Sequence, residues 1–470
     1  MQYQKTAYLT NFNIQWLAIF VCGLILFFID VTLPIVDYAV LVSTALFIFH
    51  LLLSTEMKII YIARLFLFVL VGLYAYSVKV FSPDTYFSVF EFSTQRLDVA
   101  RKMYGATLVG LPFCYLGLIK GELMAHYFSN KFRPTLRAGN PYIFIFLIGL
   151  SLTALSIYIT LTNSKGSILQ GAYGGSIEGT PLPLGGINIV AGIGIIIMLF
   201  SALKKSNLFM WLIFSLSTLY YIIFCLVLRG LRQDLASLIF SIAVTSMVVK
   251  SGQFRLKLKY LYVLLPSFAL LELFGIVRSG LSQWINGKIP FSDVLKIGLG
   301  NGQYADVIYS GTLGPISTTF ANTIDGLFFN SIPNTFGKGY FEYVIRLLPE
   351  FIYPQRPQDY AHFFKGTYSS GGGIFELAEA IINFNIFGPI LIPFVVSLVF
   401  SFLYNMFETR RTLFWTIIFG AIACSFLRGA WYQTFAYVKA LEIGIIFSTA
   451  TYLVVLLNLK TKELFGVFKS

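Results

Sequence analysis

The sequence contains few charged residues for its length. Only 12% of its 470 residues are charged, whereas 57% are hydrophobic, a balance that excludes a water-soluble globular domain. Apolar runs of about 18 residues or more recur along the chain, which is the length that a helix needs to cross a bilayer. Because lipid offers no partners for free backbone groups, these runs predict membrane-spanning helices.

Several chemical signatures are also missing. The four cysteines and three histidines form neither a C-x-x-C pair nor a cysteine–histidine cluster, so neither a disulfide framework nor a zinc site is indicated. There is no P-loop, no H-E-x-x-H, no nucleophile elbow and no D-x-D pair for a metal-bound nucleotide sugar. We therefore expect chemistry without a metal or a cofactor. The net charge of +13 is scattered between apolar runs, which argues against nucleic acid as a partner.

The apolar runs predict an all-α polytopic membrane protein with about twelve spans in a single transmembrane domain, residues 1–470. The first run is followed by Asp30 and further spans, so it is interpreted as a retained span and not as a signal peptide. The predicted spans lie near residues 14–31, 36–54, 59–80, 104–125, 141–162, 184–203, 207–228, 235–250, 260–277, 386–407, 413–428 and 435–458.

Short basic loops predict the orientation in the membrane. By the positive-inside rule, the face that carries these loops is the cytoplasm, and both termini lie there. The opposite face carries residues 278–383, a long periplasmic loop between spans 9 and 10 that we expect to hold short surface helices. The basic residues fall on alternate turns: Lys131, Arg133 and Arg137; Lys204 and Lys205; Lys250, Arg255, Lys257 and Lys259; Arg410 and Arg411; Lys460 and Lys462.

Arginines at the outer ends of the spans form the first candidate site. Arg229 and Arg232 lie in one turn between spans, and Arg278 opens the long loop. Guanidinium forks match phosphate oxygens bidentately and stay charged near lipid, so these positions suit a pyrophosphate group. The alternative is that the arginines snorkel to lipid headgroups or bridge to Asp234. Arg428 ends the penultimate span on the same face and is assigned to the same basic cluster.

The long loop also contains a stretch that three prolines stiffen and that is rich in polar and aromatic groups. Its residues Tyr353, Asp359 and Tyr360 suit a sugar ring, which offers an apolar face and many hydroxyls. His362 could accept a proton from an acceptor hydroxyl. A lone histidine in a loop is, however, more often a solvated or hydrogen-bonded side chain.

Two acids follow a glycine triplet at residues 371–373. Glu376 and Glu379 are three apart and would share one face of a helix. Acids this close to hydrocarbon are expensive to desolvate, so one of them is a candidate general base. The alternative is a first-turn acid that favours the helix N-terminus. Asn383, further along the same segment, is assigned to sugar binding.

These features together resemble the O-antigen polymerase (Wzy) family, which polymerises the oligosaccharide repeat units of bacterial surface polysaccharides. The architecture covers nearly the whole chain. The short matches are the Gly-x-Arg turn at 230–232, the Pro-x-x-x-Tyr-Pro-x-Arg-Pro stretch at 349–357, and the glycine-rich lead into Glu376 and Glu379 with Asn383, Phe384 and Gly388 beyond.

The resemblance implies a fold similar to the lipid-donor (GT-C-like) membrane glycosyltransferases, in the bacterial inner membrane with the active site facing the periplasm. The growing glycan would move from undecaprenyl pyrophosphate to the non-reducing end sugar of a new lipid-linked repeat unit. A chain-length regulator and a flippase would be partners, beside membrane lipids. The implied pyrophosphate ligands are Arg232 with Arg229, Arg278 or Arg356, and the implied base is Glu376, Glu379 or His362.

Two other functions remain open from the sequence. An O-antigen ligase has a similar architecture, and a histidine deep in the long loop would favour it, although the context of His362 after Arg356 is more like a polymerase. A lipid-linked oligosaccharide flippase or transporter should show two similar halves and charges at mid-membrane. In this sequence the charges gather at one predicted face.

Overall fold

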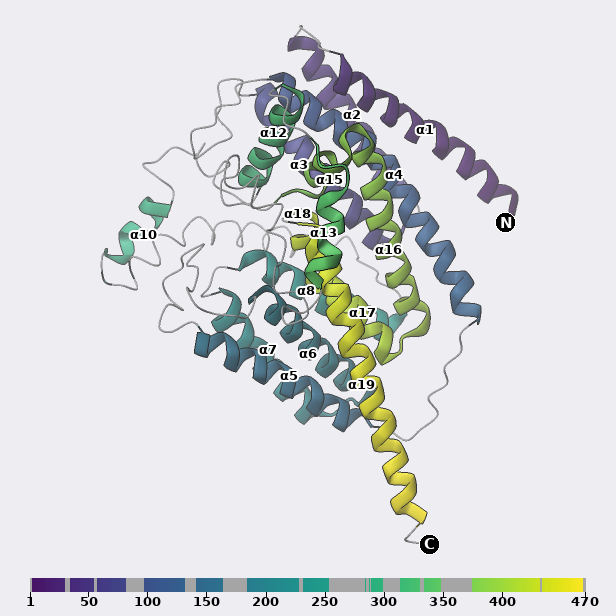
Figure 1. The fold of residues 1–470 in the computed structure, drawn as a ribbon, viewed down its shortest axis with the longest axis vertical. Helices are drawn as coiled ribbons and strands as arrows, with labels where there is room; N and C mark the ends of the chain where they lie inside the picture. The colour runs from purple at the N-terminus through teal and green to yellow at the C-terminus, as the bar shows by residue number, and fades with distance from the viewer. Residues whose placement is uncertain are drawn as a thin grey trace. The chain divides into compact units, whose positions relative to one another are not determined.

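A computed structural model shows the fold of the chain (Figure 1). Every element that it describes is a helix. The chain divides into two compact units, one of residues 1–123, 305–402 and 429–434 and one of residues 124–304, 403–428 and 435–470. The described residues are 2–29, 34–54, 57–81, 97–131, 141–163, 184–227, 231–252, 284, 287, 289–298, 313–329, 334–347, 374–431 and 433–467.

The first unit contains α1 (Gln2–Phe28), α2 (Pro34–Ser54), α3 (Ile59–Phe81), most of α4 (Leu97–Lys131), α12 (Leu313–Phe328), α13 (Lys338–Leu347), α15 (Glu376–Phe384), the 3-10 turn η4 (Asn385–Phe387) and most of α16 (Gly388–Arg410). The second contains α5 (Tyr142–Asn163), α6 (Leu184–Lys205), α7 (Leu208–Tyr220), the π-helix η2 (Tyr221–Val227), α8 (Arg232–Ser251), α10 (Phe291–Gly298), α17 (Leu413–Cys424) and α19 (Phe435–Val467). The short α18 (Phe426–Trp431) contributes residues to both.

Within the described residues, eight helical segments are long and apolar enough to cross a membrane. Three shorter apolar helices, at Ile14–Phe28, Ile35–His50 and Leu413–Cys424, coincide with further predicted spans. The predicted span at 260–277 lies outside the described residues. The all-α polytopic membrane protein is therefore confirmed, and the count of about twelve spans stays a prediction. The eight segments are Ile59–Phe81, Leu97–Ser129, Tyr142–Thr162, Gly186–Lys205, Leu208–Leu226, Gln233–Ser251, Glu376–Arg410 and Phe435–Leu457.

Glycines allow close helix packing in the first unit. A Cβ atom added at Gly117 of α4 would lie 2.3 Å from the carbonyl oxygen of Phe394 in α16. One added at Gly121 would lie 2.3 Å from the carbonyl oxygen of Leu398. Small residues are used in this way in membrane proteins because they let two backbones approach each other. α16 is the long helix that follows α15 in the chain, and its close packing against α4 holds it in place.

In the second unit, α6 is the central helix. It packs against α5, α7, α8, α17 and α19, and α5, α6 and α7 lie side by side (Figure 1). Its contact with α5 is backbone to backbone, because a Cβ at Gly149 would lie 2.7 Å from the carbonyl oxygen of Gly194. Ile195 and Met198 are wholly buried in the core around α6. This packing fixes the start of α6, where a polar side chain, Asn188, lies.

The structure differs from the prediction at three helix ends. α4 begins at Leu97, earlier than the predicted 104, and the predicted span at 207–228 changes from α7 into the π-helix η2. The span predicted to begin at 386 is preceded by α15, and the two helices are separated by a turn in which Asn385 has a φ of 52°. Within 278–383, the described part contains the short helices α10, α12 and α13 and most of α15. Its periplasmic location stays a prediction.

Candidate functional site

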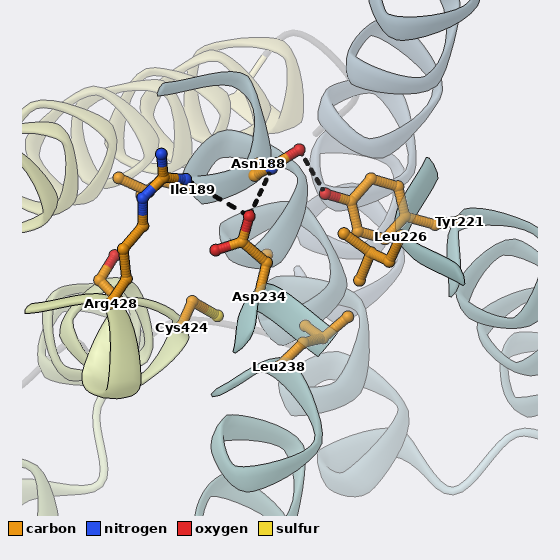
Figure 2. A pocket seen from close by; sticks show the side chains of 10 residues that line it. Asn188, Ile189, Tyr221, Leu226, Asp234, Leu238, Cys424 and Arg428 are labelled. Atoms are coloured by element: carbon orange, nitrogen blue, oxygen red, sulfur yellow. Dashed lines mark hydrogen bonds and ion pairs between the residues drawn. The ribbon is translucent and has the colours of Figure 1, made fainter. Parts of the chain in front are cut away.

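A polar pocket in the second unit lies where α6, η2, α8, α17 and α18 meet (Figure 2). Asn188 comes from the start of α6, Tyr221 from η2, Asp234 from the first turn of α8 and Arg428 from α18. The cavity volume is about 20 Å³, room for about one water molecule. Polar side chains from four separate elements therefore surround a small cavity.

A chain of hydrogen bonds organises these side chains. The Tyr221 hydroxyl donates to Asn188 Oδ1 at 3.1 Å, and Asn188 Nδ2 donates to Asp234 Oδ2 at 2.8 Å. Arg428 Nη1 contacts the same Asp234 oxygen at 3.4 Å. The Asp234 side chain is 11% exposed, whereas that of Arg428 is 42% exposed. A mostly buried carboxylate thus anchors a guanidinium group that is still open to solvent.

The backbone around the pocket explains why these groups converge. The chain changes from α7 to a π-helix at Tyr221, and the Leu231 N–H donates to the carbonyl oxygen of Leu226 at 2.9 Å, which joins the end of η2 to the start of α8. π-helical turns are rare and frequently occur at functional sites. Asp234 lies in the first turn of α8, where the helix dipole favours a negative charge.

Only one of the predicted pyrophosphate ligands, Arg428, has its side chain in the described part of the structure. Arg428 lies at the pocket, where it contacts Asp234. Arg232 is the first residue of α8, but its side chain is outside the described part. The sequence left open that the arginines of the turn at 229–232 bridge to Asp234. In the structure, Arg428 makes such a bridge. The other predicted residues outside the described part are Arg229, Arg278, Arg356, His362, Tyr353, Asp359 and Tyr360.

The predicted acids lie in the first unit, both buried in α15. Arg64 Nη2 of α3 donates to the two carboxylate oxygens of Glu376 at 2.5 and 2.6 Å. The side chains of Arg64 and Glu376 are 1% and 0% exposed. Arg64 also contacts the Ser397 hydroxyl of α16 at 3.4 Å. Glu376 therefore has its charge balanced within the protein.

Glu379 lies one turn further along α15 in a different environment. It is buried, and its Oε2 accepts a hydrogen bond from the backbone N–H of Thr434 at 2.9 Å. Among the described residues, no basic side chain forms an ion pair with it. The two predicted acids thus differ in their partners: Glu376 pairs with the Arg64 guanidinium, whereas Glu379 accepts a hydrogen bond from the backbone of Thr434.

Asn383, predicted to bind sugar, contacts other parts of the protein. Its Oδ1 accepts hydrogen bonds from the Thr335 hydroxyl at 3.1 Å and from the Gly339 N–H at 2.9 Å, and its Nδ2 donates to the carbonyl oxygen of Glu379 at 2.9 Å. These contacts hold Thr335 and the first turn of α13 against α15. Sugar binding by Asn383 stays a prediction, and its visible role is to position α15.

Sequence reasoning missed the charged residues inside the apolar runs. Asp37 of α2 accepts hydrogen bonds from Nε and Nη2 of Arg101 in α4, both at 2.6 Å, and from the Tyr76 hydroxyl of α3 at 2.5 Å. The signal was available, because an ionisable residue inside a span is rare and pairs with another. Asn188, a lone amide in the apolar run of α6, was missed as well.

Comparisons with known proteins do not extend the assignment: no family model, curated protein or solved structure matches the chain. Within the described residues, no three histidine, cysteine, aspartate or glutamate side chains are grouped closely enough to hold a metal ion. The fold defines the class, an all-α polytopic membrane protein. A more specific function is argued from the two sites.

Proposed function

We propose that the chain is a membrane glycosyltransferase of the O-antigen polymerase kind. It would transfer a growing glycan from undecaprenyl pyrophosphate to the non-reducing end sugar of a new lipid-linked repeat unit, at the periplasmic face of the bacterial inner membrane. The observation that carries the proposal is Arg428, a half-exposed guanidinium group held by one contact to a mostly buried carboxylate in a polar pocket.

The chemistry needs a cation for the leaving group. The acceptor hydroxyl oxygen bonds to the anomeric carbon of the glycan while the bond from that carbon to the pyrophosphate oxygen breaks, and the electron pair leaves with the lipid pyrophosphate. Preorganised arginines stabilise the charge that develops on that oxygen. Arg428 has donors left for this after its contact with Asp234, and Arg232 begins the helix beside the pocket. No metal enters this scheme.

The chemistry also needs a base for the acceptor hydroxyl. Glu379 fits this role better than Glu376, because the Arg64 guanidinium occupies both oxygens of Glu376. Among the described residues Glu379 has no cationic partner, and a carboxylate without one in hydrocarbon surroundings is costly to keep, which supports a functional reason for its presence. His362 remains an alternative base outside the described residues.

One observation favours a second function, a lipid-linked oligosaccharide flippase or transporter. The pairs Arg64–Glu376 and Asp37–Arg101 are buried ion pairs between apolar helices, and such pairs also occur along the substrate pathways of transporters. In both pairs, however, the two charges are paired with each other within the protein. A ligase would use the same donor as a polymerase and differs only in the acceptor, so an experiment must separate all three.

The test is the surface-glycan ladder of the strain that carries the chain, with the chromosomal copy deleted and variants supplied at matched expression. A polymerase deletion leaves one repeat unit on the lipid core, the wild type restores the ladder, and both Arg428→Gln and Arg232→Ala leave the single unit. Lys205→Gln, a charge removal at an exposed residue of α6, should restore the full ladder. If the deletion removes even the single capped unit, the ligase or flippase function replaces the polymerase.

A further inference from the structure

Four exposed cations lie at helix ends of the second unit. Lys204 and Lys205 end α6, and Lys250 lies in the last turn of α8. Arg411 lies in the turn between α16 and α17. All four residues are exposed, and within the described part of the chain none of them forms an ion pair. These helix ends therefore present positive charge without a paired acid in that part.

Contacts between the helices bring these cations to one place. α6 packs against α7 and α8, and α8 packs against α17. Lys250 Nζ lies 5.9 Å from the centre of the Trp211 ring, in the first turns of α7, which follows α6 directly in the chain. Gly252 ends α8 with a φ of 82°, and a Cβ atom there would collide with the Arg411 guanidinium. The end of α8 therefore contacts both the start of α7 and the Arg411 side chain.

The start of α7 adds an apolar surface beside the cations. Leu208 is 84% exposed and Phe209 is 67% exposed. These two residues begin the segment Leu208–Leu226, which is long and apolar enough to cross a membrane. They therefore mark the level at which the hydrocarbon begins, and the cations lie next to it.

This combination restricts the chemistry of the ligand. Phosphate oxygens accept hydrogen bonds from guanidinium and ammonium groups, and both cations attract a negative charge. Free inorganic phosphate would use only the cations, whereas an anionic phospholipid would also place its acyl chains on the apolar surface. Basic pockets between membrane-spanning helices bind anionic headgroups in this way. A zwitterionic phospholipid gains less, because its own ammonium group offsets the charge of its phosphate.

We propose that the ends of α6, α7, α8 and α17 form a binding site for an anionic phospholipid, with Lys250 and Arg411 contacting the phosphodiester group and Leu208 and Phe209 contacting the acyl chains. The inference goes beyond the proposed function and does not depend on it, since a ligase or a flippase would have the same site. The alternative is that the cations only orient the chain in the membrane or complement the ends of α6 and α8. Neither of these roles predicts a lipid preference that depends on individual side chains.

Binding is measured by native mass spectrometry of the full-length protein purified in a neutral detergent. The probes are dioleoyl phosphatidylglycerol, which is anionic, and dioleoyl phosphatidylcholine, which has the same acyl chains and no net charge. The wild type should bind phosphatidylglycerol at least about tenfold more tightly, because each cation near a headgroup contributes about fivefold. Lys250→Gln and Arg411→Gln should each lower that affinity about fivefold and leave the affinity for phosphatidylcholine unchanged. Both residues are exposed, so the variants should fold as the wild type does.

Lys338→Gln is the matched control. It removes a cation that is 72% exposed on α13 of the first unit, and it should bind both lipids as the wild type does. Equal affinity of the wild type for the two lipids, or an equal loss with Lys338→Gln, overturns the inference. Excess inorganic phosphate should leave the lipid bound, and displacement would show a site for free anions instead. A chain that shows the preference but never restores a glycan ladder keeps the lipid site and loses the polymerase function.

Discussion

Arg64 donates hydrogen bonds to both carboxylate oxygens of Glu376, although 312 residues separate the two in the sequence. The pair joins α3 to α15 and is almost completely buried. It separates the roles of the two acids of α15, because Glu376 is balanced by a cation and Glu379 contacts the backbone N–H of Thr434. The pair therefore positions the helix, and Glu379 is the candidate for chemistry.

We expect Glu379→Gln to abolish glycan elongation without unfolding the protein. The amide oxygen can still accept the Thr434 N–H, but it cannot take a proton from the acceptor hydroxyl, and removal of a general base typically lowers the rate by about 10²–10⁴. The readouts are the surface-glycan ladder and the thermal unfolding of the purified protein. The matched control, Glu376→Gln, should instead lower the unfolding temperature. A normal ladder with Glu379→Gln would leave His362 as the remaining candidate base.

Substitution of one member of the Arg64–Glu376 pair should destabilise the protein more than substitution of both members. Arg64→Met or Glu376→Leu alone leaves one uncompensated buried charge, which costs about 3–5 kcal/mol, whereas replacement of both residues by apolar ones is often nearly neutral. The double variant should therefore recover most of the loss, as measured by unfolding of the purified protein in one detergent. Additive losses in the double variant would show that the two side chains do not act as a pair.

The turn between α15 and α16 should tolerate no side chain at Gly388. A Cβ atom there would lie 2.2 Å from the carbonyl oxygen of Ala380, a backbone atom that cannot move without shifting α15. Gly388→Ala should destabilise the protein by about 1–3 kcal/mol, the usual range for overpacking, and should reduce elongation because Glu379 moves with the helix.

Gly186→Ala is the matched control for this substitution. The nearest atom to its new Cβ would be the Ile443 side chain at 3.9 Å, an ordinary contact distance. The same methyl group should therefore leave both unfolding and elongation unchanged. Equal effects of the two substitutions would mean that the close approach at Gly388 is not maintained in the membrane.

The spans could be predicted from the sequence because hydropathy is a local property. The runs at 59–80 and 141–162, for example, match the helices Ile59–Phe81 and Tyr142–Asn163 closely. The turn after α15 could not be predicted, since it depends on the φ of 52° at Asn385 and on contact between Gly388 and Ala380. Apolar composition alone does not distinguish one long helix from two that meet at a turn.

The sequence predicted the types of residue that the candidate sites use, but not which of these residues contact each other. Arg428 was assigned to an anion site from its charge and position, and Asp234 appeared only as a possible bridge for neighbouring arginines. That these two meet with Asn188 depends on the packing of α6, α8 and α18, which no spacing in the sequence encodes. The Arg64–Glu376 pair is equally non-local.

The Asp37 network should show a graded response to substitution. Asp37→Ala leaves the buried Arg101 guanidinium without its carboxylate and should cost about 3–5 kcal/mol. Tyr76→Phe removes one hydrogen bond to a charged group and should cost about 1.5–3 kcal/mol. Unfolding of each variant in the same detergent checks this order. A larger loss for Tyr76→Phe would mean that its stacking on Tyr104, with ring centroids 5.2 Å apart, depends on the hydroxyl.

Tyr340 of α13 should make the protein less stable in alkali. Burial, with the negative charges of Glu379 and Glu376 adding to it, raises the pKa of the Tyr340 phenol well above its ordinary value. Above about pH 10, the unfolded chain releases this proton and the folded protein keeps it. The folded state then binds more protons than the unfolded state, so the free energy of unfolding falls as pH rises through this range, by up to about 1.4 kcal/mol per pH unit.

Tyr340→Phe should remove this part of the pH dependence. Phenylalanine keeps the ring that stacks on Phe384, with centroids 5.8 Å apart and planes 9° apart, so the two proteins should unfold alike at pH 7. Their unfolding curves should separate between about pH 9 and 11, where the variant becomes the more stable of the two. Parallel curves over this range would mean that water reaches the phenol in the folded protein, since a hydrated phenol titrates alike in both states.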